Sequence, residues 1–273
     1  MSTQEEKGKI FRALHERNDA FLIPNPWDIG PARLLAGLGF EALATTSAGY
    51  AFSAGKLDGA IGRDEMMNHI AAIAAATELP VSADLENGFG DAPELVAETI
   101  RMAAQAGVAG GSIEDLSGRG AGGVYELEHA VERVRAAAEA ARGLPFPFTL
   151  TARAENYLAG RPDLADTIKR LQAYQEAGAD VLYAPGLRDL ASMKLVASSV
   201  SKPLNVVMSA GDPDLSAAEM EAVGVKRISV GGALSRLALA AFMKGAREMK
   251  DKGGFTWMRD TIATKDLKPI FRA

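Results

Sequence analysis

Eight short runs of apolar or β-branched residues alternate along this chain with eight alanine-rich stretches of helical periodicity. The runs are residues 21–24, 42–46, 81–85, 111–114, 148–153, 181–184, 204–207 and 227–230. The helical patterns are residues 31–37, 63–76, 92–106, 126–141, 164–177, 189–199, 216–223 and 234–250. Because these runs are short and do not alternate between apolar and polar residues, they predict strands that are buried on both faces of a parallel sheet.

Glycine marks the points where four of these helices give way to strands, at Gly39, Gly107, Gly178 and Gly224. Eight strand-then-helix units form either a closed barrel or an open doubly wound sheet. No long interruption and no Pro/Ser-rich linker divides the 273 residues, which favours the closed form. We therefore predict an α/β fold in which residues 1–273 form a single (β/α)₈ TIM barrel domain.

The composition excludes several classes of function. A net charge of −5 gives no reason to expect a nucleic acid or an anionic membrane as a partner. The absence of cysteine removes disulfides, thiolate metal sites and a cysteine nucleophile together. The charged start lacks the apolar segment of a signal peptide, and no apolar run approaches the length of a membrane helix. These features predict a soluble, cytoplasmic enzyme.

Three acidic residues follow two successive predicted strands, where a barrel carries its active site. Asp84 and Glu86 stand two residues apart, so on an extended chain their side chains share one face. Glu114 ends the next strand. Such carboxylates repel one another unless a cation lies among them, and oxygen ligands suit Mg²⁺ or Mn²⁺. The alternative is that they are helix caps or solvated loop charges.

Other polar groups follow neighbouring strands. Arg153 could bind a substrate carboxylate and stabilise developing negative charge, or it could pair with Glu155 or Glu114. The backbone amides of Thr46, Ser47 and Ala48 could form a carboxylate-binding nest. Asp58 could reach a metal's outer sphere, although an aspartate before glycine is also an ordinary turn residue. Candidate wall residues follow the later strands: Tyr183, Asn205, Met208 and Arg236.

Two further patterns have simpler interpretations. Residues 118–123 match G-x-G-x-x-G, but they do not directly follow a strand, and the acidic residues before them would repel a pyrophosphate. We interpret the glycine-rich segment 117–123 as a mobile lid over the barrel mouth. His15, His69 and His129 fall in helical patterns without metal-ligand spacing, which favours core or surface roles.

Five motifs occur in order along the chain, and together they resemble the isocitrate lyase/phosphoenolpyruvate mutase superfamily over about residues 21–242. They are Pro24-Asn25-Pro26-Trp27-Asp28 with Ala32-Arg33; Thr45-Thr46-Ser47 followed by Gly55 and Asp58; Ala83-Asp84-Leu85-Glu86-Asn87-Gly88-Phe89-Gly90; Ser112-Ile113-Glu114-Asp115; and Thr151-Ala152-Arg153. The resemblance is to the carboxyvinyl-carboxyphosphonate phosphorylmutase-like, or oxo-acid lyase, branch.

The resemblance implies Mg²⁺ held by Asp84, Glu86 and Glu114, directly or through water, with Asp58 nearby. It implies that Arg153 and the amides around Thr46, Ser47 and Ala48 hold the carboxylate of a 2-oxo acid. Arg153, Asp58 and Glu114 are then the expected catalytic residues. Family members commonly form tetramers that exchange a C-terminal helix between paired subunits, so a helical extension and a homo-oligomer are expected, with residues 253–273 packed on a neighbour.

This chain also departs from the family. It lacks the lid cysteine of isocitrate and methylisocitrate lyases and the Lys-Xaa-Phe-Pro-Lys type of lid of the mutases, and Glu86 replaces a usual Asp. We therefore expect a Mg²⁺-dependent lyase that cleaves a carbon–carbon bond in a small 2-oxo or 2-hydroxy (di)carboxylic acid through a metal-stabilised enolate. Two alternatives stay open: P–C bond chemistry of the phosphoenolpyruvate mutase or phosphonopyruvate hydrolase type, and a non-catalytic barrel that binds an oxo-acid.

Overall fold

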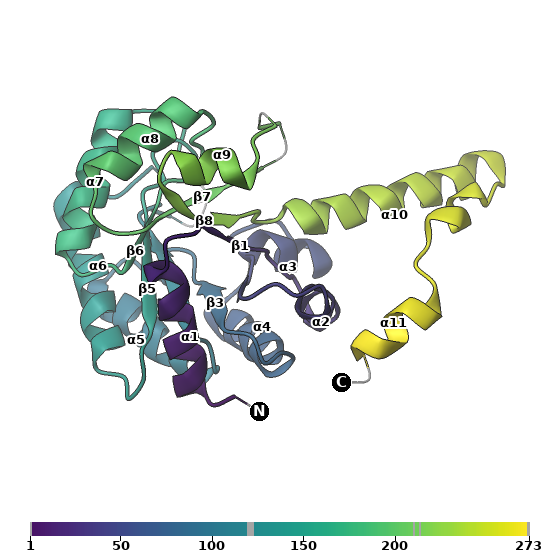
Figure 1. Ribbon diagram of the computed structural model, residues 1–273, viewed down its shortest axis with the longest axis horizontal. Helices are drawn as coiled ribbons and strands as arrows, with labels where there is room; N and C mark the ends of the chain where they lie inside the picture. The colour runs from purple at the N-terminus through teal and green to yellow at the C-terminus, as the bar shows by residue number, and fades with distance from the viewer. Residues whose placement is uncertain (1, 119–122, 210, 213, 272–273) are drawn as a thin grey trace.

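The computed structural model describes residues 2–118, 123–209, 211–212 and 214–271. In these ranges eight parallel strands form one sheet in the order β1-β8-β7-β6-β5-β4-β3-β2 (Figure 1). The strands are β1 (Phe21–Ile23), β2 (Leu43–Ala44), β3 (Val81–Asp84), β4 (Gly110–Glu114), β5 (Thr149–Arg153), β6 (Val181–Tyr183), β7 (Leu204–Val207) and β8 (Val225–Ser229). The predicted (β/α)₈ barrel is confirmed.

Hydrogen bonds between the two end strands of this order bring the sheet close to a closed barrel. The amide of Ala44 donates to the carbonyl of Pro24 over 3.1 Å, and the Asn25 side chain donates to the carbonyl of Thr45 over 3.1 Å. Asn25 also accepts from the amides of Val230 and Gly231, each at 2.9 Å. One buried amide side chain therefore joins the ends of β1, β2 and β8.

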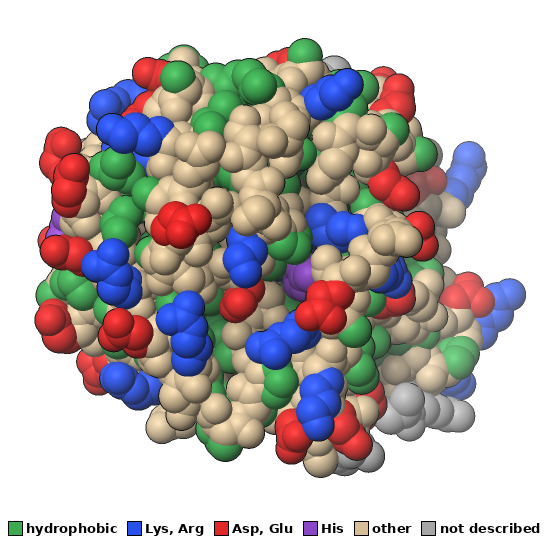
Figure 2. All heavy atoms as spheres, turned by 60° about the vertical axis from the view of Figure 1, so that its left-hand side comes forward, with side chains coloured by type: hydrophobic (Ala, Val, Ile, Leu, Met, Phe, Trp, Pro, Cys, Tyr) green, Lys and Arg blue, Asp and Glu red, His purple; other side chains and the backbone are tan. Residues whose placement is uncertain are grey.

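Helices cover the outside of the sheet (Figure 1). They are α2 (Ile29–Gly37), α3 (Ser47–Ser53), α4 (Arg63–Ala75), α5 (Pro93–Gln105), α6 (Leu127–Arg142), α7 (Leu164–Glu176), α8 (Leu190–Ser199) and α9 (Ala217–Ala222). Short polar side chains begin several of them: Asp28, Thr46, Asp163, Asp189 and Ser216 each accept a hydrogen bond from a first-turn amide. On the face that Figure 2 shows, acidic and basic side chains are interspersed.

An additional helix, α1 (Gln4–Glu16), was not among the predicted helices. Its N-cap residue Thr3 and Glu6 form a capping box. Phe11 and Leu14 lie on its buried face and pack with Phe21 and Ile23 of β1. The helix therefore closes the barrel at the amino-terminal ends of the strands, opposite the expected site.

The strands are buried on both faces, as predicted, but their polarity alternates. On β5, Leu150 and Ala152 belong to the apolar clusters between the sheet and the helices. Thr151 and Arg153 instead project into the barrel, where Thr151 binds Arg227 and Arg153 lines a pocket. The description of these runs as non-alternating was therefore wrong for β5. A polar interior leaves space where bulky aliphatic layers usually fill such a barrel.

A C-terminal arm extends from the barrel, which confirms the expected helical extension. It consists of α10 (Ala233–Lys252), the short 3₁₀ helix η1 (Thr256–Asp260) and α11 (Thr264–Phe271). Figure 1 shows α10 projecting outward and the chain turning back toward α2. A Cβ atom on Gly37 of α2 would lie 3.1 Å from Ile270 of α11, so the returning helix contacts the barrel there. No helix in the described ranges is long and apolar enough to cross a membrane.

Candidate active site

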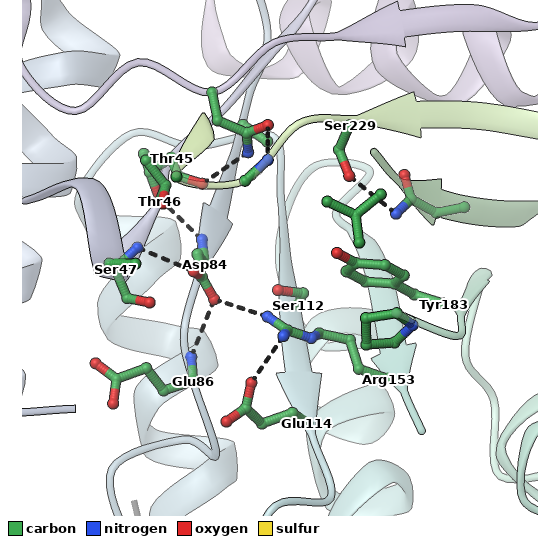
Figure 3. Close-up of a pocket in the computed structure, with 18 of the residues that line it drawn as sticks. Thr45, Thr46, Ser47, Asp84, Glu86, Ser112, Glu114, Arg153, Tyr183 and Ser229 are labelled. Atoms are coloured by element: carbon green, nitrogen blue, oxygen red, sulfur yellow. Dashed lines mark hydrogen bonds and ion pairs between the residues drawn. The ribbon is translucent and has the colours of Figure 1, made fainter. Parts of the chain in front are cut away.

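The carboxyl ends of the strands surround a pocket of about 430 Å³ (Figure 3). All eight predicted site residues line it: Thr46, Ser47, Ala48, Asp58, Asp84, Glu86, Glu114 and Arg153. They come from β3, β4, β5 and the segments after β2, so chain segments more than 100 residues apart meet in one cavity. Their convergence was predicted from the strand positions, and their roles remain predictions.

Arg153 forms ion pairs with three carboxylates. Its Nε donates to Glu155 over 2.7 Å, Nη1 to Asp84 over 3.1 Å, and Nη2 lies 3.2 Å from Glu114. The guanidinium also stacks on Tyr183, with its central carbon 5.0 Å from the ring centre. The ion-pair interpretation of Arg153 is therefore correct, and the same side chain also faces the pocket, as the substrate-binding interpretation requires (Figure 3).

The charges around Arg153 shift the pKa of each partner. Burial alone lowers the pKa of Arg153, but the carboxylates of Glu155, Glu114 and Asp84 outweigh it and raise that pKa well above its ordinary value. Burial raises the pKa of Glu114 well above its usual range, because the negative charges of Glu155, Asp84 and Glu86 offset the effect of Arg153. Burial likewise raises the pKa of Glu155. Among the residues that the structure describes, acidic groups outnumber the guanidinium of Arg153 here, so the mouth is suited to an additional cation.

Asp84 is held in place from the neighbouring strand. Its backbone amide donates to the Thr45 hydroxyl over 2.9 Å, and its Oδ2 accepts from the amide of Ser47 over 3.0 Å. Thr46 caps α3 by accepting from the amide of Gly49 over 3.2 Å. Thr46, Ser47 and Ala48 therefore lie at the start of α3, where the amide of Ser47 donates to the Asp84 carboxylate, and their role as a substrate-binding nest stays a prediction.

Glu86 reaches the pocket by a different route from the one predicted. β3 ends at Asp84, and Glu86 lies in a turn with a left-handed φ of 49°. Phe89, in the same turn, has φ 61°. The argument that Asp84 and Glu86 share one face of an extended strand was therefore wrong. A non-glycine residue in this conformation costs about 1 kcal/mol or more, and such strain is characteristic of functional sites.

Asp58 lies on the exposed loop between α3 and α4, with its carboxyl at the pocket wall. Oδ1 accepts from the amide of Gly59 over 3.1 Å, which is the turn interaction expected of an aspartate before glycine. Although the residue as a whole is exposed, partial burial of the carboxyl and the negative charge of Asp84 raise its pKa. Asp58 is therefore both a turn residue and a member of the acidic group.

The donors present fit a hard cation that keeps part of its water shell. Four carboxylates, from Asp58, Asp84, Glu86 and Glu114, line the one pocket. In the described part of the chain, no three histidine or carboxylate side chains are placed to bind a single ion together. Mg²⁺ commonly uses one or two protein carboxylates and completes its octahedron with water and substrate. The oxygen-only donor set is compatible with that mode.

Several other predictions can be placed relative to the pocket. Tyr183 and Asn205 line it, whereas Met208 and Arg236 are not among the lining residues. Glu155, predicted only as an ion-pair partner of Arg153, is buried beside it. Sequence reasoning missed Arg227, which enters the barrel from β8. The predicted strand began at Arg227, whereas β8 begins at Val225; a strand with a charged side chain in its interior would have been the signal.

The predicted lid and the three histidines can be compared with the described residues. Leu116 and Val124 form an antiparallel bridge, and the amide of Ser117 donates to the carbonyl of Gly123 over 2.7 Å, which closes the base of the segment. Residues 119–122 lie outside the described residues, so the lid stays a prediction. His15 and His69 are buried and His129 is half-buried; none of the three lines the pocket.

Comparison with known proteins places this site in a family context. Residues 11–250 match the family described as phosphoenolpyruvate phosphomutase. A crystal structure from Burkholderia cenocepacia J2315, assigned provisionally to a lyase or mutase, is 59% identical with a TM-score of 0.96, covering 99% of this chain and 97% of that one. An oxaloacetate decarboxylase of Chromohalobacter salexigens is 30% identical over 96% of this chain and 92% of its own length. The structure of 2,3-dimethylmalate lyase, a member of the PEP mutase/isocitrate lyase superfamily, is 27% identical with a TM-score of 0.87, covering 99% and 95%.

Proposed function

Since this chain belongs to the phosphoenolpyruvate phosphomutase family of the isocitrate lyase/phosphoenolpyruvate mutase superfamily, we propose that it is a Mg²⁺-dependent lyase of small 2-oxo or 2-hydroxy dicarboxylates. Its relatives include enzymes named for carbon–carbon cleavage, and the chain is a carbon–carbon lyase of this superfamily. The two named relatives act on oxaloacetate and 2,3-dimethylmalate, which supports a dicarboxylate substrate.

One observation carries the proposal: four carboxylates and Arg153 meet in a single pocket at the mouth of the barrel. The acidic excess supports a divalent cation, with Asp84, Glu86 and Glu114 as the residues that would hold it. When bound, Mg²⁺ supplies a positive charge that stabilises the oxyanion formed when a C–C bond beside an oxo group breaks. The donor set and the relatives therefore support the same class of reaction.

The chain's own groups have separate roles in this proposal. Arg153 keeps Nε on the buried Glu155, while Nη1 and Nη2 face the pocket and would donate to the substrate carboxylate and to the developing oxyanion. The first turn of α3, with Thr46, Ser47 and Ala48, would orient that carboxylate through backbone amides. Asp58, whose pKa is raised by burial and by the charge of Asp84, is the group that would hold or release a proton.

The test is a panel of 2-oxo and 2-hydroxy mono- and dicarboxylates, assayed with Mg²⁺ for release of pyruvate, glyoxylate or CO₂. We expect Glu114→Gln to lose metal-dependent turnover, while Glu98→Gln, on the exposed surface of α5, serves as the matched control. Full activity of Glu114→Gln in the presence of EDTA would contradict the proposal.

The family's name also supports a second candidate, P–C bond chemistry. A ³¹P NMR assay with phosphonopyruvate distinguishes it, because only a P–C bond reaction converts the phosphonate signal to a phosphate ester or to inorganic phosphate. A third result, saturable thermal stabilisation by oxalate with Mg²⁺ and no turnover of any oxo-acid, would instead indicate a barrel that only binds its ligand.

We also propose that the C-terminal arm packs against a second copy of the chain. The arm exposes large apolar side chains: Leu237, Leu239, Phe242, Met243, Met249, Phe255, Met258 and Ile262. Contiguous apolar surface of this kind marks an interaction site, and the family resemblance supports helix exchange in a tetramer. Light scattering coupled to size-exclusion chromatography should give an oligomer for the wild type and a smaller species for Phe242→Asp. A wild-type monomer at micromolar concentration would contradict this.

A further inference from the structure

The interior of the barrel below the mouth is lined by polar side chains. Ser82, Ser112, Asn205 and Ser229 are buried and line the same pocket as the acidic cluster. Arg227 also lines it and is 4% exposed. A layer of small hydroxyl groups in place of aliphatic side chains gives the pocket a polar floor with a cation in it.

The contacts of Arg227 are with neutral groups. Nε donates to Asn205 Oδ1 over 2.7 Å, Nη2 donates to the Thr151 hydroxyl over 3.0 Å, and Nη1 lies 3.4 Å from Nε2 of His15. Asn205 is oriented by its own donation to the Ser229 hydroxyl over 3.2 Å. These neighbours hold the guanidinium in one position without neutralising its charge.

No carboxylate in the described ranges pairs with Arg227. Burial lowers the pKa of Arg227 to about 10, and the charge of Arg153 acts in the same direction. His15, behind the guanidinium, adds no negative charge, because burial and the charge of Arg227 lower its pKa to about 3 and leave the ring neutral. The charged groups that face this position are therefore all cationic: Arg153 from β5 and, beyond His15, Lys226.

We infer that Arg227, with Asn205 and Ser229, binds the distal carboxylate of a dicarboxylate substrate whose 2-oxo or 2-hydroxy acid end lies at the mouth. This rests on the proposed function for the mouth, and it adds a second anion site on the floor of the same pocket. Arg227 supplies the charge, and the remaining N–H of the Asn205 side-chain amide donates a second hydrogen bond to the carboxylate. The Ser229 hydroxyl, which itself donates to the carbonyl of Val206 over 3.2 Å, accepts from Asn205 and so positions that amide.

The spacing of the two arginines suits this assignment. Arg227 binds Thr151, which precedes Arg153 by two residues on β5, or about 6.6 Å of strand rise. The Arg227 guanidinium therefore lies at the inward-facing position below Arg153, and a four- or five-carbon diacid can extend between these two positions. Tyr183 has Arg153 on its ring and Ser229 near its hydroxyl (Figure 3).

The test compares three probes by calorimetry with Mg²⁺ present. Oxalate is expected to occupy the mouth alone. The diacid 3,3-difluorooxaloacetate has both the 2-oxo acid end and a distal carboxylate. The matched monoacid, 3,3-difluoro-2-oxobutanoate, has a methyl group in place of that distal carboxylate. We expect the wild type to bind the diacid at least 10-fold more tightly than the matched monoacid. Arg227→Met should lower the affinity for the diacid by about 10- to 100-fold and leave the affinity for oxalate within about 2-fold of the wild-type value.

The outcomes separate this inference from the function proposed for the mouth. Failure of the wild type to bind oxalate with Mg²⁺ would contradict the function proposed for the mouth. Oxalate binding with equal wild-type affinity for diacid and monoacid would overturn the role of Arg227, and that measurement needs no variant. An equal loss for all three probes in Arg227→Met would indicate a structural cation only and would also overturn it. Arg227→Lys keeps the positive charge but not the planar guanidinium with its paired N–H donors. It should cause a smaller loss of affinity, confined to the diacid.

Discussion

Two buried arginines enter the same barrel interior, and their surroundings are opposite. Arg153, at the mouth, pairs with Glu155, Asp84 and Glu114. Arg227, on the floor, contacts Asn205, Thr151 and His15, all neutral. The pKa of Arg153 is raised well above its ordinary value, whereas that of Arg227 is lowered to about 10.

The difference indicates which charge each level of the pocket lacks. Among the described residues the mouth has more carboxylates than cations, an excess that the proposed metal would balance. In the same ranges the floor has a cation without a counter-ion, which the proposed distal carboxylate would balance. Burying an unpaired charge costs several kcal/mol, and such groups persist where a ligand compensates them. A metal at one end and a substrate carboxylate at the other satisfy both requirements.

The largest effect is expected on turnover, at the mouth. Arg153→Met removes the donors proposed for the substrate carboxylate and the oxyanion, and should lower kcat/KM by about 10²- to 10³-fold. Arg63→Met, which breaks an exposed pair with Glu98, is the matched control and should retain wild-type kinetics. Steady-state assays on the oxo-acid identified by the panel measure this, and near-normal kinetics of Arg153→Met would remove Arg153 from the mechanism.

The next effect is on stability without metal. Arg153→Met leaves buried carboxylates without their cation and should lower the free energy of unfolding by about 3 kcal/mol. Arg227→Met removes a hydrogen-bond donor from groups that are all neutral, and should lower the free energy of unfolding by about 1 kcal/mol. Urea denaturation in EDTA measures both. Adding Mg²⁺ should stabilise Arg153→Met more than wild type; equal losses for the two variants would mean that the environments are not electrostatically opposite.

A third prediction concerns pH and the neutral partner of Arg227. His15 has a folded-state pKa of about 3 and an ordinary value of 6.5. Below pH 6.5 the unfolded chain binds a proton that the folded chain does not, so stability is lost as pH falls toward 3. His15→Gln should reduce this slope by about 1.4 kcal/mol per pH unit. Denaturation between pH 4 and 6 measures this slope, with His129→Gln, at a half-buried position of α6, as the control. An unchanged slope in His15→Gln would show that His15 does not titrate as expected.

The smallest effect is on the pKa of His15 itself. Burial is the main cause of its lowered pKa, and the charge of Arg227 is the second. Arg227→Met should therefore raise the pKa of His15 while leaving it below 6.5. NMR titration of the ring protons follows this directly. A pKa that does not move would mean that the charge of Arg227 is already neutralised, which would weaken the contrast between the two arginines.

Much of the mouth was predictable because parallel strands bring their carboxyl ends together. Once the strand order along the chain was recognised, Asp84, Glu114 and Arg153 had to converge, and they do. Glu86 shows the limit of that reasoning: it reaches the pocket from a left-handed turn, and local sequence spacing does not predict a backbone conformation that surrounding packing maintains. Helix α3 was missed because its seven residues are too few for a clear periodic pattern.

The sequence by itself determined the barrel, through eight repeated strand-and-helix patterns, and the acidic character of its mouth. Only the tertiary structure decided how the charges are paired. Arg153 could have been satisfied by one carboxylate and is held by three, while Arg227 appeared only as the first residue of a predicted strand. Alternating polarity along a strand predicts which side chains point inward. Only the closure of the barrel brings β5, β7 and β8 together around Arg227, whose charge has no counter-ion among the described residues.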